Sequence, residues 1–399
     1  MAHDAEVKGS PATIRKQSGQ FGLINLLKAG AAQLIVLHHL AFYGPMTDSA
    51  RELVPGTIDW LDHYGRIAVQ VFLVIGGFLA AKSLAPDGRP GIANPLAAAW
   101  RRYVKLAPPF IAAMLLATVA SSVARHWMDH ESISGPASLG QLGAHALLLH
   151  DVLGVEALSA GAWYVAIDFQ LYVLTTLLLW SCGLLLARAG ASRVAAWLLP
   201  VVVTGGVCAS LLYFNRDADW DVWAPYFFGS YGLGILAWWA SDPKRKPLGT
   251  TALLLMMIVP TLLALLLDFR SRIAVAMVVA CLLMLFGRTR SPATASQGWA
   301  AVDYLGKISY SIFLVHFPVC LVVNAVFTRF VDDDPALQAA GALLAWAASV
   351  TAGGLFHRWV EVPLASILPG LGKPLKPAAP AVRTGPVAPV APKPARLRG

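Results

Sequence analysis

Three ionisable residues with possible chemical roles lie inside apolar segments of the chain, where an apolar side chain such as leucine would be favoured. Lys28 and His39 share the segment "LKAGAAQLIVLHHL" (27–40), and Asp168 lies in "WYVAIDFQLY" (163–172). A carboxylate beside a histidine makes the imidazole a positioned general base, because it fixes the tautomer and stabilises the imidazolium. The residue types therefore indicate general-base chemistry by His39 and Asp168. A structural ion pair or a proton relay would use the same two residues.

The spacing of Lys28 and His39 places both on one face of a helix. They are eleven positions apart, which is three turns plus about 20°, and about 16 Å along the axis. Lipid would reject such a face, so we expect it to point into the bundle interior or a water-filled cavity. Lys28 also suits a simpler role, with its ammonium reaching the inner membrane interface. His38 points elsewhere and is interpreted as a hydrogen-bonded packing residue.

The other polar groups in apolar segments form two sets. Three basic residues in "AAAWRRYVKLAPPF" (97–110) stand where a span meets the cytoplasm, and they suit phosphates or lipid headgroups equally. These residues are Arg101, Arg102 and Lys105. The second set is Ser309, Tyr310 and His316 in "LGKISYSIFLVHFPV" (305–319), with Glu361 in "HRWVEVP" (357–363). The pattern alone describes His316 as a packed histidine.

The glycines and cysteines in apolar segments have structural interpretations of their own. Paired glycines in "VFLVIGGFLA" (71–80) permit tight helix packing or the close approach of a ligand. The four cysteines all fall in apolar runs without paired spacing, which is typical of small buried residues. Neither a disulfide framework nor a metal site is expected.

The composition predicts the elements that position these residues. Hydrophobic residues make up 57% of the 399, and charged residues only 13%, so the solvent of this chain must be largely lipid. We predict an all-α polytopic membrane protein with about ten transmembrane helices. Runs that can cross about 30 Å of hydrocarbon lie near 22–43, 67–84, 104–124, 162–187, 194–214, 223–240, 248–267, 272–287, 306–328 and 337–360.

Charge predicts the orientation of these spans. With both termini cytoplasmic, most of the 31 Lys and Arg residues fall on the cytoplasmic side, as the positive-inside rule requires. The segment 138–157 is interrupted by His145, His150 and Asp151 and is interpreted as an interfacial or re-entrant helix on the outer side. An eleventh span there would invert the rest of the chain and place "KRK" (244–246) outside. The net charge of +9 indicates this topology and attraction to anionic lipid, and no nucleic-acid partner.

The domain organisation is simple. Residues 1–20 are polar and mixed in charge, which predicts a cytoplasmic segment and no cleavable signal peptide. Residues 21–365 form one membrane domain without obvious repeats. Residues 366–399 are basic and rich in Pro and Ala, which predicts a disordered cytoplasmic tail. The sequence does not indicate an oligomeric state.

Taken together, the motifs resemble those of the acyltransferase 3 family of integral membrane O-acyltransferases. That family has an Arg eleven residues before a His, as Lys28 and His39 stand here. Its "FFxxSGF" and "RRxxRLxP" motifs are matched by "FLVIGGF" (72–78) and "RRYVKLAP" (101–108). The remaining motifs, "WxLxxExxFY", "GxxSYxxYLxHxP" and "ExP", are matched by Trp163, Asp168, Leu171 and Tyr172, by Gly306, Ser309, Tyr310, Phe313, Leu314, His316 and Pro318, and by Glu361 and Pro363. This chain departs from the family at Lys28, Gly76, Lys105 and Asp168, where the family has Arg, Ser, Arg and Glu.

The resemblance implies transfer of an acyl group, usually acetyl, from cytoplasmic acyl-CoA to a hydroxyl of an envelope or exported glycan. On this basis Arg101, Arg102 and Lys105 would hold the CoA phosphates, and the pantetheine arm would pass Lys28. His39, oriented by Asp168, would take the acceptor's proton; an acyl-His39 relay stays open. The residues expected to support substrate or structure are Trp163, Tyr172, Ser309, Tyr310, His316 and Glu361. The implied partners are acyl-CoA, a carbohydrate acceptor and the bilayer of the inner membrane, and no metal is implied.

The sequence leaves three alternatives to acetyl transfer onto a glycan open. A succinyl or other acyl donor, or a small-molecule acceptor, would leave the same motifs. A proton-coupled transporter would also place His, Asp and Lys on facing helices, although it is expected to show repeat symmetry. A membrane scaffold or export subunit would not need a cationic mouth aligned with a His–Asp pair.

Overall fold

The computed structural model describes residues 22–189, 195–289 and 297–367, and every regular element within them is helical. The all-α class is therefore confirmed. The long helices are α1 (Gly22–Tyr43), α4 (Ala68–Leu84), α5 (Pro95–Ala124), α7 (Ala162–Ala189), α8 (Ala195–Leu212), α9 (Ala224–Ala240), α10 (Pro247–Leu267), α11 (Ser271–Phe286), α12 (Gln297–Phe330) and α13 (Pro335–Phe356). The short elements are α2 (Pro45–Ala50), α3 (Pro55–Tyr64), η1 (Gly65–Ile67), α6 (Leu139–Ala146), η2 (Phe214–Arg216), η3 (Ala218–Trp220), η4 (His357–Glu361) and α14 (Val362–Ile367).

Eight helical segments in the described ranges are long and apolar enough to cross a membrane. They are Gly22–Tyr43, Pro55–Leu84, Pro95–Ala124, Ala162–Arg188, Trp197–Arg216, Pro247–Leu267, Gly298–Phe330 and Pro335–Ile367. The other two predicted spans coincide with α9 and α11, which have 17 and 16 residues, fewer than the roughly 20 that a typical span needs. The count of ten and the orientation of the termini remain predictions. The segment 1–20 and almost all of 366–399 lie outside the described residues.

Helix α5 begins earlier than the span predicted at 104–124. The side chain of Asn94 accepts a hydrogen bond from the backbone N–H of Ala97 (3.0 Å), and Pro95 occupies the first helical turn. An Asn cap followed by proline is a strong helix start, so the basic residues at 101–105 lie within the helix. Of these residues, Arg102 reaches Asp168 of α7.

The segment 138–157 does not form an eleventh spanning helix. Ser138 and Gln141 form a reciprocal capping box at the start of α6. Helix α6 has eight residues and rises only about 12 Å. It is followed by a turn in which Leu148 has a left-handed backbone (φ 59°). The interfacial location of this segment remains a prediction.

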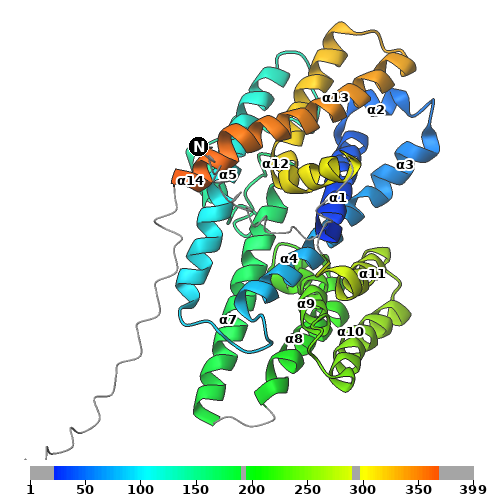
Figure 1. Cartoon of the computed structure of the whole chain (residues 1–399). Helices are drawn as coiled ribbons and strands as arrows, with labels where there is room; N and C mark the ends of the chain where they lie inside the picture. Colours follow the sequence, from blue (N-terminus) through cyan, green and yellow to red (C-terminus); the bar gives the residue numbers. More distant parts are fainter. Residues whose placement is uncertain (1–21, 190–194, 290–296, 368–399) are drawn as a thin grey trace, which may run out of the picture.

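The helices form two groups joined by α4 and α7. Figure 1 shows α8, α9, α10 and α11 together at one end, and α1, α12 and α13 at the other. Every residue of α9 except Pro225 is buried. Helix α4 approaches α9 so closely that a Cβ atom on Gly77 would collide with the backbone of Tyr231. Gly77 is therefore a packing glycine, and α4 is fixed where the two groups meet.

Candidate active site

Two neighbouring cavities lie where α1, α4, α5, α7 and α12 meet. The histidine cavity, of about 640 Å³, is lined by His38, His39, Tyr43, Asp62, His63, Arg66, Asp151, Trp163, Asp221 and apolar neighbours. The cationic cavity, of about 310 Å³, is lined by Lys28, Gly76, Arg102, Lys105, Tyr164, Asp168, Lys307, Ser309, Tyr310, Glu361 and apolar neighbours. Each cavity thus has its own set of ionisable groups.

His39 of α1 is paired with His316 of α12. The Nδ1 atom of His39 lies 2.6 Å from the Nε2 atom of His316, and the two rings are stacked with centroids 4.9 Å apart. The Nδ1 atom of His316 lies 2.7 Å from the carbonyl oxygen of Phe313 and 3.2 Å from that of Ile312. Both histidines are buried. His316 is therefore more than packing, because it connects His39 to the backbone of α12.

This chain of contacts assigns both tautomers. A carbonyl oxygen can only accept a hydrogen bond, so Nδ1 of His316 carries its proton and Nε2 of the neutral ring is an acceptor. Nδ1 of His39 must then donate to that acceptor. The Nε2 atom of His39 is left with a free lone pair, and it makes no hydrogen bond within the described part of the chain. That atom can accept a proton, as a general base must.

The structure does not pair His39 with Asp168, so this predicted orientation of the base is corrected. Asp168 lines the cationic cavity and forms an ion pair with Arg102 of α5 (2.5 Å). The Arg102 guanidinium also lies over the ring of Tyr172, 5.3 Å from its centroid. A carboxylate in an apolar bundle needs a nearby cation and hydrogen bonds, and the early start of α5 provides one. His316 holds the position beside His39 that the sequence assigned to Asp168.

The remaining predicted donor-site residues divide between the cavity and its surroundings. Lys28 is half-buried in the cationic cavity, and Lys105 lies exposed at its edge. Arg101 is half-buried and does not line this cavity. Lys307, which the sequence placed only among the cytoplasmic charges, lines it and is exposed. Four cationic side chains therefore face two carboxylates there, which leaves an excess of positive charge.

Gly76 and the polar residues of α12 form the rest of the cationic cavity. A Cβ atom on Gly76 would lie 3.0 Å from Cε2 of Tyr231 and 3.5 Å from a carboxylate oxygen of Asp168, so the glycine allows α4 to pack closely beside the ion pair. Glu361 accepts hydrogen bonds from Ser311 (2.5 Å) and His357 (2.9 Å). Tyr310 donates to the carbonyl oxygen of Leu106 (3.0 Å), and Ser309 to that of Gly306 (3.0 Å). Glu361 and Tyr310 thus hold neighbouring elements together around the cavity.

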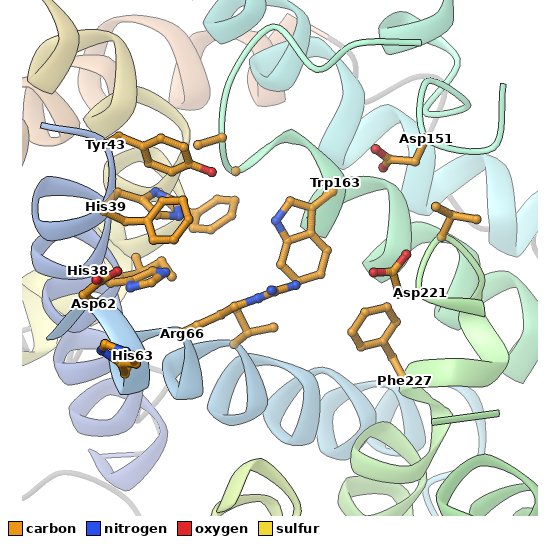
Figure 2. A pocket seen from close by; sticks show the side chains of 17 residues that line it. His38, His39, Tyr43, Asp62, His63, Arg66, Asp151, Trp163, Asp221 and Phe227 are labelled. Atoms are coloured by element: carbon orange, nitrogen blue, oxygen red, sulfur yellow. The ribbon is translucent and has the colours of Figure 1, made fainter. Parts of the chain in front are cut away.

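The histidine cavity is lined by aromatic and acidic side chains that the sequence did not reveal as a group. Figure 2 shows Trp163 projecting between His39 and Tyr43 on one side and Asp221 on the other. The guanidinium of Arg66 lies 5.4 Å from the centroid of the Trp163 ring. Asp62, Asp151 and Asp221 come from three separate segments. Only the fold places these carboxylates around one cavity, Asp62 beside His38 and the other two on the far side of Trp163 (Figure 2).

Two groups in the segment between α6 and α7 have perturbed acidities. Burial and the neighbouring carboxylate of Asp221 raise the pKa of Asp151 to about 6. Burial and the neighbouring His145 lower the pKa of His150 to about 3. The two residues touch, with His150 Nε2 3.3 Å from Asp151 Oδ2. His38 lines the cavity as well, and its Nδ1 donates to the carbonyl oxygen of Leu61 (2.9 Å).

Comparison with known proteins gives one family. The model of the acyltransferase 3 family, described as an acyltransferase domain, matches residues 22–358. No curated protein and no solved structure matches the chain. Except for Glu361, the ionisable residues of both cavities lie within the matched range. The chain is a multi-pass membrane acyltransferase by length, composition and family, and it belongs to the acyltransferase 3 family.

Proposed function

We propose that this chain transfers an acyl group, most simply acetyl, from acyl-CoA to a hydroxyl of an envelope or exported glycan in the inner membrane. The observation that carries this proposal is the free Nε2 lone pair of His39, on the wall of a cavity that adjoins an excess of positive charge. A base between a site for an anionic donor and a site for a polar acceptor is what hydroxyl acylation requires.

The cationic cavity is the proposed donor site. Coenzyme A carries phosphates, and ammonium groups bind phosphates through charge-assisted hydrogen bonds. Lys28, Lys105 and Lys307 are available for this role. Arg102 is already paired with Asp168, so we assign it to the support of the cavity. Arg101 does not line the cavity and is left out of the proposed site.

The histidine cavity is the proposed acceptor site. Trp163 offers a flat apolar face with a polar edge, which suits the alternating apolar and hydroxyl surfaces of a sugar ring. The carboxylates of Asp62, Asp151 and Asp221 can accept hydrogen bonds from hydroxyl groups. His39 lines the same cavity, so a hydroxyl bound there is close to the base.

The proposed reaction uses one proton and two bond changes. Nε2 of His39 takes the proton of the acceptor hydroxyl as that oxygen attacks the thioester carbonyl and forms the new C–O bond. The C–S bond of the tetrahedral intermediate then breaks, and His39 returns the proton to the leaving sulfur. His316 is a positioning residue. Its Nε2 holds His39 in the required tautomer and accepts from the imidazolium while the charge lasts.

The proposal is tested by label transfer in membranes that contain the full-length chain. Acetyl-CoA with a labelled acetyl group is added, and label in the glycan fraction is compared with that in membranes lacking the chain. The expected result is label in the glycan that mild alkali releases as acetate, because an O-ester is labile to base. Label from succinyl-CoA alone would overturn the choice of acetyl. Chain-dependent label only in small soluble molecules would overturn the glycan acceptor.

A further inference from the structure

We infer that the ring of Phe313 is the barrier between the donor and acceptor cavities, and that it sets the size of the acyl group that can be transferred. This inference rests on the proposed function of the two cavities. Phe313 of α12 lines both of them. Among the described residues it is the one side chain common to the two linings. A group passing from one cavity to the other must therefore pass its ring.

The ring of Phe313 is held from several sides. Phe72 of α4 and Tyr164 of α7 contact it edge-on, with ring centroids 6.4 and 5.3 Å away. Gly161, directly before α7, faces the tip of the ring, and a Cβ atom there would lie only 3.0 Å from its Cζ atom. Phe72 and Tyr164 also line the cationic cavity. The ring of Phe313 thus lies in a narrow aromatic neck, where a methyl group added at Gly161 would press on the ring.

Phe313 of the neck and His316, which positions the proposed base His39, lie on the same turn of α12. The carbonyl oxygen of Phe313 accepts the hydrogen bond from Nδ1 of His316 (2.7 Å), and the two rings are 5.9 Å apart. His316 in turn contacts His39. A thioester carbonyl that reaches the acceptor oxygen beside His39 must lie at this neck. The carbons of the acyl group must then fit among the rings of Phe72, Tyr164 and Phe313.

Two consequences follow for the chemistry. A short acyl group fits the neck, whereas each added methylene group must displace one of the packed rings. The Phe313 ring also keeps the water of the histidine cavity away from the thioester. Without it, a water oxygen can form the C–O bond while the C–S bond breaks and His39 passes the proton to sulfur. The products are then a free carboxylic acid and the CoA thiol.

The test measures donor preference and hydrolysis with the full-length chain in membranes or detergent. Wild type and Phe313→Ala are compared for kcat/KM with acetyl-, butyryl- and hexanoyl-CoA, and for free CoA thiol released without acceptor. In Phe313→Ala, the ratio of kcat/KM for hexanoyl-CoA to kcat/KM for acetyl-CoA is expected to rise by about tenfold or more, because a pocket can discriminate to this extent between groups that differ by a methylene. The variant is also expected to hydrolyse acetyl-CoA faster than wild type. The matched control is Phe330→Ala, which removes an exposed ring from the end of the same helix.

A second variant covers the case in which Phe313→Ala does not fold. Gly161→Ala adds a methyl group against the ring of Phe313, so it is expected to lower the butyryl-to-acetyl ratio below that of wild type. Folded variants at either position with wild-type ratios and wild-type hydrolysis would overturn the role of Phe313, while transfer by wild type would leave the proposed function standing. Wild type that transfers no acyl group from any of the three donors would overturn the proposed function, and this inference with it.

Discussion

His39 and His316 are 277 residues apart in the sequence, yet their Nδ1 and Nε2 atoms lie 2.6 Å apart between α1 and α12. This contact decides which nitrogen of His39 is free. Because Nδ1 of His316 donates a hydrogen bond to the carbonyl oxygen of Phe313, the donor and the acceptor are fixed in both hydrogen bonds of this series. The role of His39 as the proposed base depends on this contact.

Replacing His316 by Ala is expected to lower kcat for acyl transfer by about 100-fold, within the usual range for a lost acid–base contribution, with little change in KM. His39 keeps its place in α1 but loses the acceptor that selects its tautomer. His316→Gln offers a side-chain oxygen as acceptor, so it is expected to recover part of the loss. If Ala and Gln reduced kcat equally, or if both acted only on KM, His316 would not be orienting the base.

The Arg102–Asp168 ion pair is expected to act mainly on stability. Asp168→Asn leaves the guanidinium of Arg102 buried without its carboxylate, which is expected to destabilise the fold by about 3 kcal/mol. The matched control is Asp59→Asn, which breaks the exposed pair with Arg51 and is expected to cost less than about 1 kcal/mol. Thermal unfolding in detergent measures both. Equal shifts in Tm for the two variants would contradict the structural role of Asp168.

Lysines of the cationic cavity are expected to control the affinity for the donor. Lys105→Ala and Lys307→Ala each remove one phosphate-binding charge at the edge of the cavity. We expect several-fold higher KM for acyl-CoA, an unchanged kcat, and a smaller effect at high salt, because exposed charges are screened. Lys246→Ala, at an exposed position away from the cavity, serves as the control. If the double variant Lys105→Ala, Lys307→Ala had an unchanged KM for acyl-CoA, the phosphates would not bind in this cavity.

The pKa of Asp151, raised to about 6 by burial and by Asp221, predicts a pH-dependent gain in stability on mutation. A carboxyl whose pKa is higher in the folded state favours folding while it is protonated, and this contribution is lost as pH rises through about 6. Asp151→Asn is therefore expected to have a higher Tm than wild type at pH 8. The difference should shrink as pH falls from 6 toward 4. A Tm difference that is constant across this range would show that Asp151 ionises normally.

The sequence predicted the helical class and the location of the apolar helices, because runs of apolar residues near the length of a bilayer core have few other structures available. It missed the start of α5 at Pro95, where the Asn94 cap and the proline extend the helix beyond its apolar part. That extension decides the partner of Asp168. Depth in the membrane can be read from position in a span, whereas the neighbour across the bundle depends on how the helices are rotated and packed.

The candidate site was predicted only in part, because contacts across the bundle depend on how the helices are rotated and packed. Lys28, His39 and Asp168 were predicted because ionisable groups are expensive in apolar helices, and Lys105 because it belongs to a basic cluster that suits phosphates. His316 was described as a packed histidine because its partner lies on another helix. Phe313 carries no charge, so its place between two cavities had no signal in the sequence. Asp62 and Asp221 lie in polar segments, where carboxylates are ordinary, and Asp151 was noted only as an interruption of the apolar segment 138–157.

His39 is the proposed general base of acyl transfer. The decisive measurement is kcat of the purified full-length chain with saturating acetyl-CoA and acceptor, determined for His39→Ala and normalised to folded protein. The control is His126→Ala, an exposed histidine near the end of α5. We expect kcat to fall by about 100-fold or more in His39→Ala and to stay unchanged in the control. A His39→Ala chain that folds and transfers acetyl at the wild-type rate would contradict this role of His39.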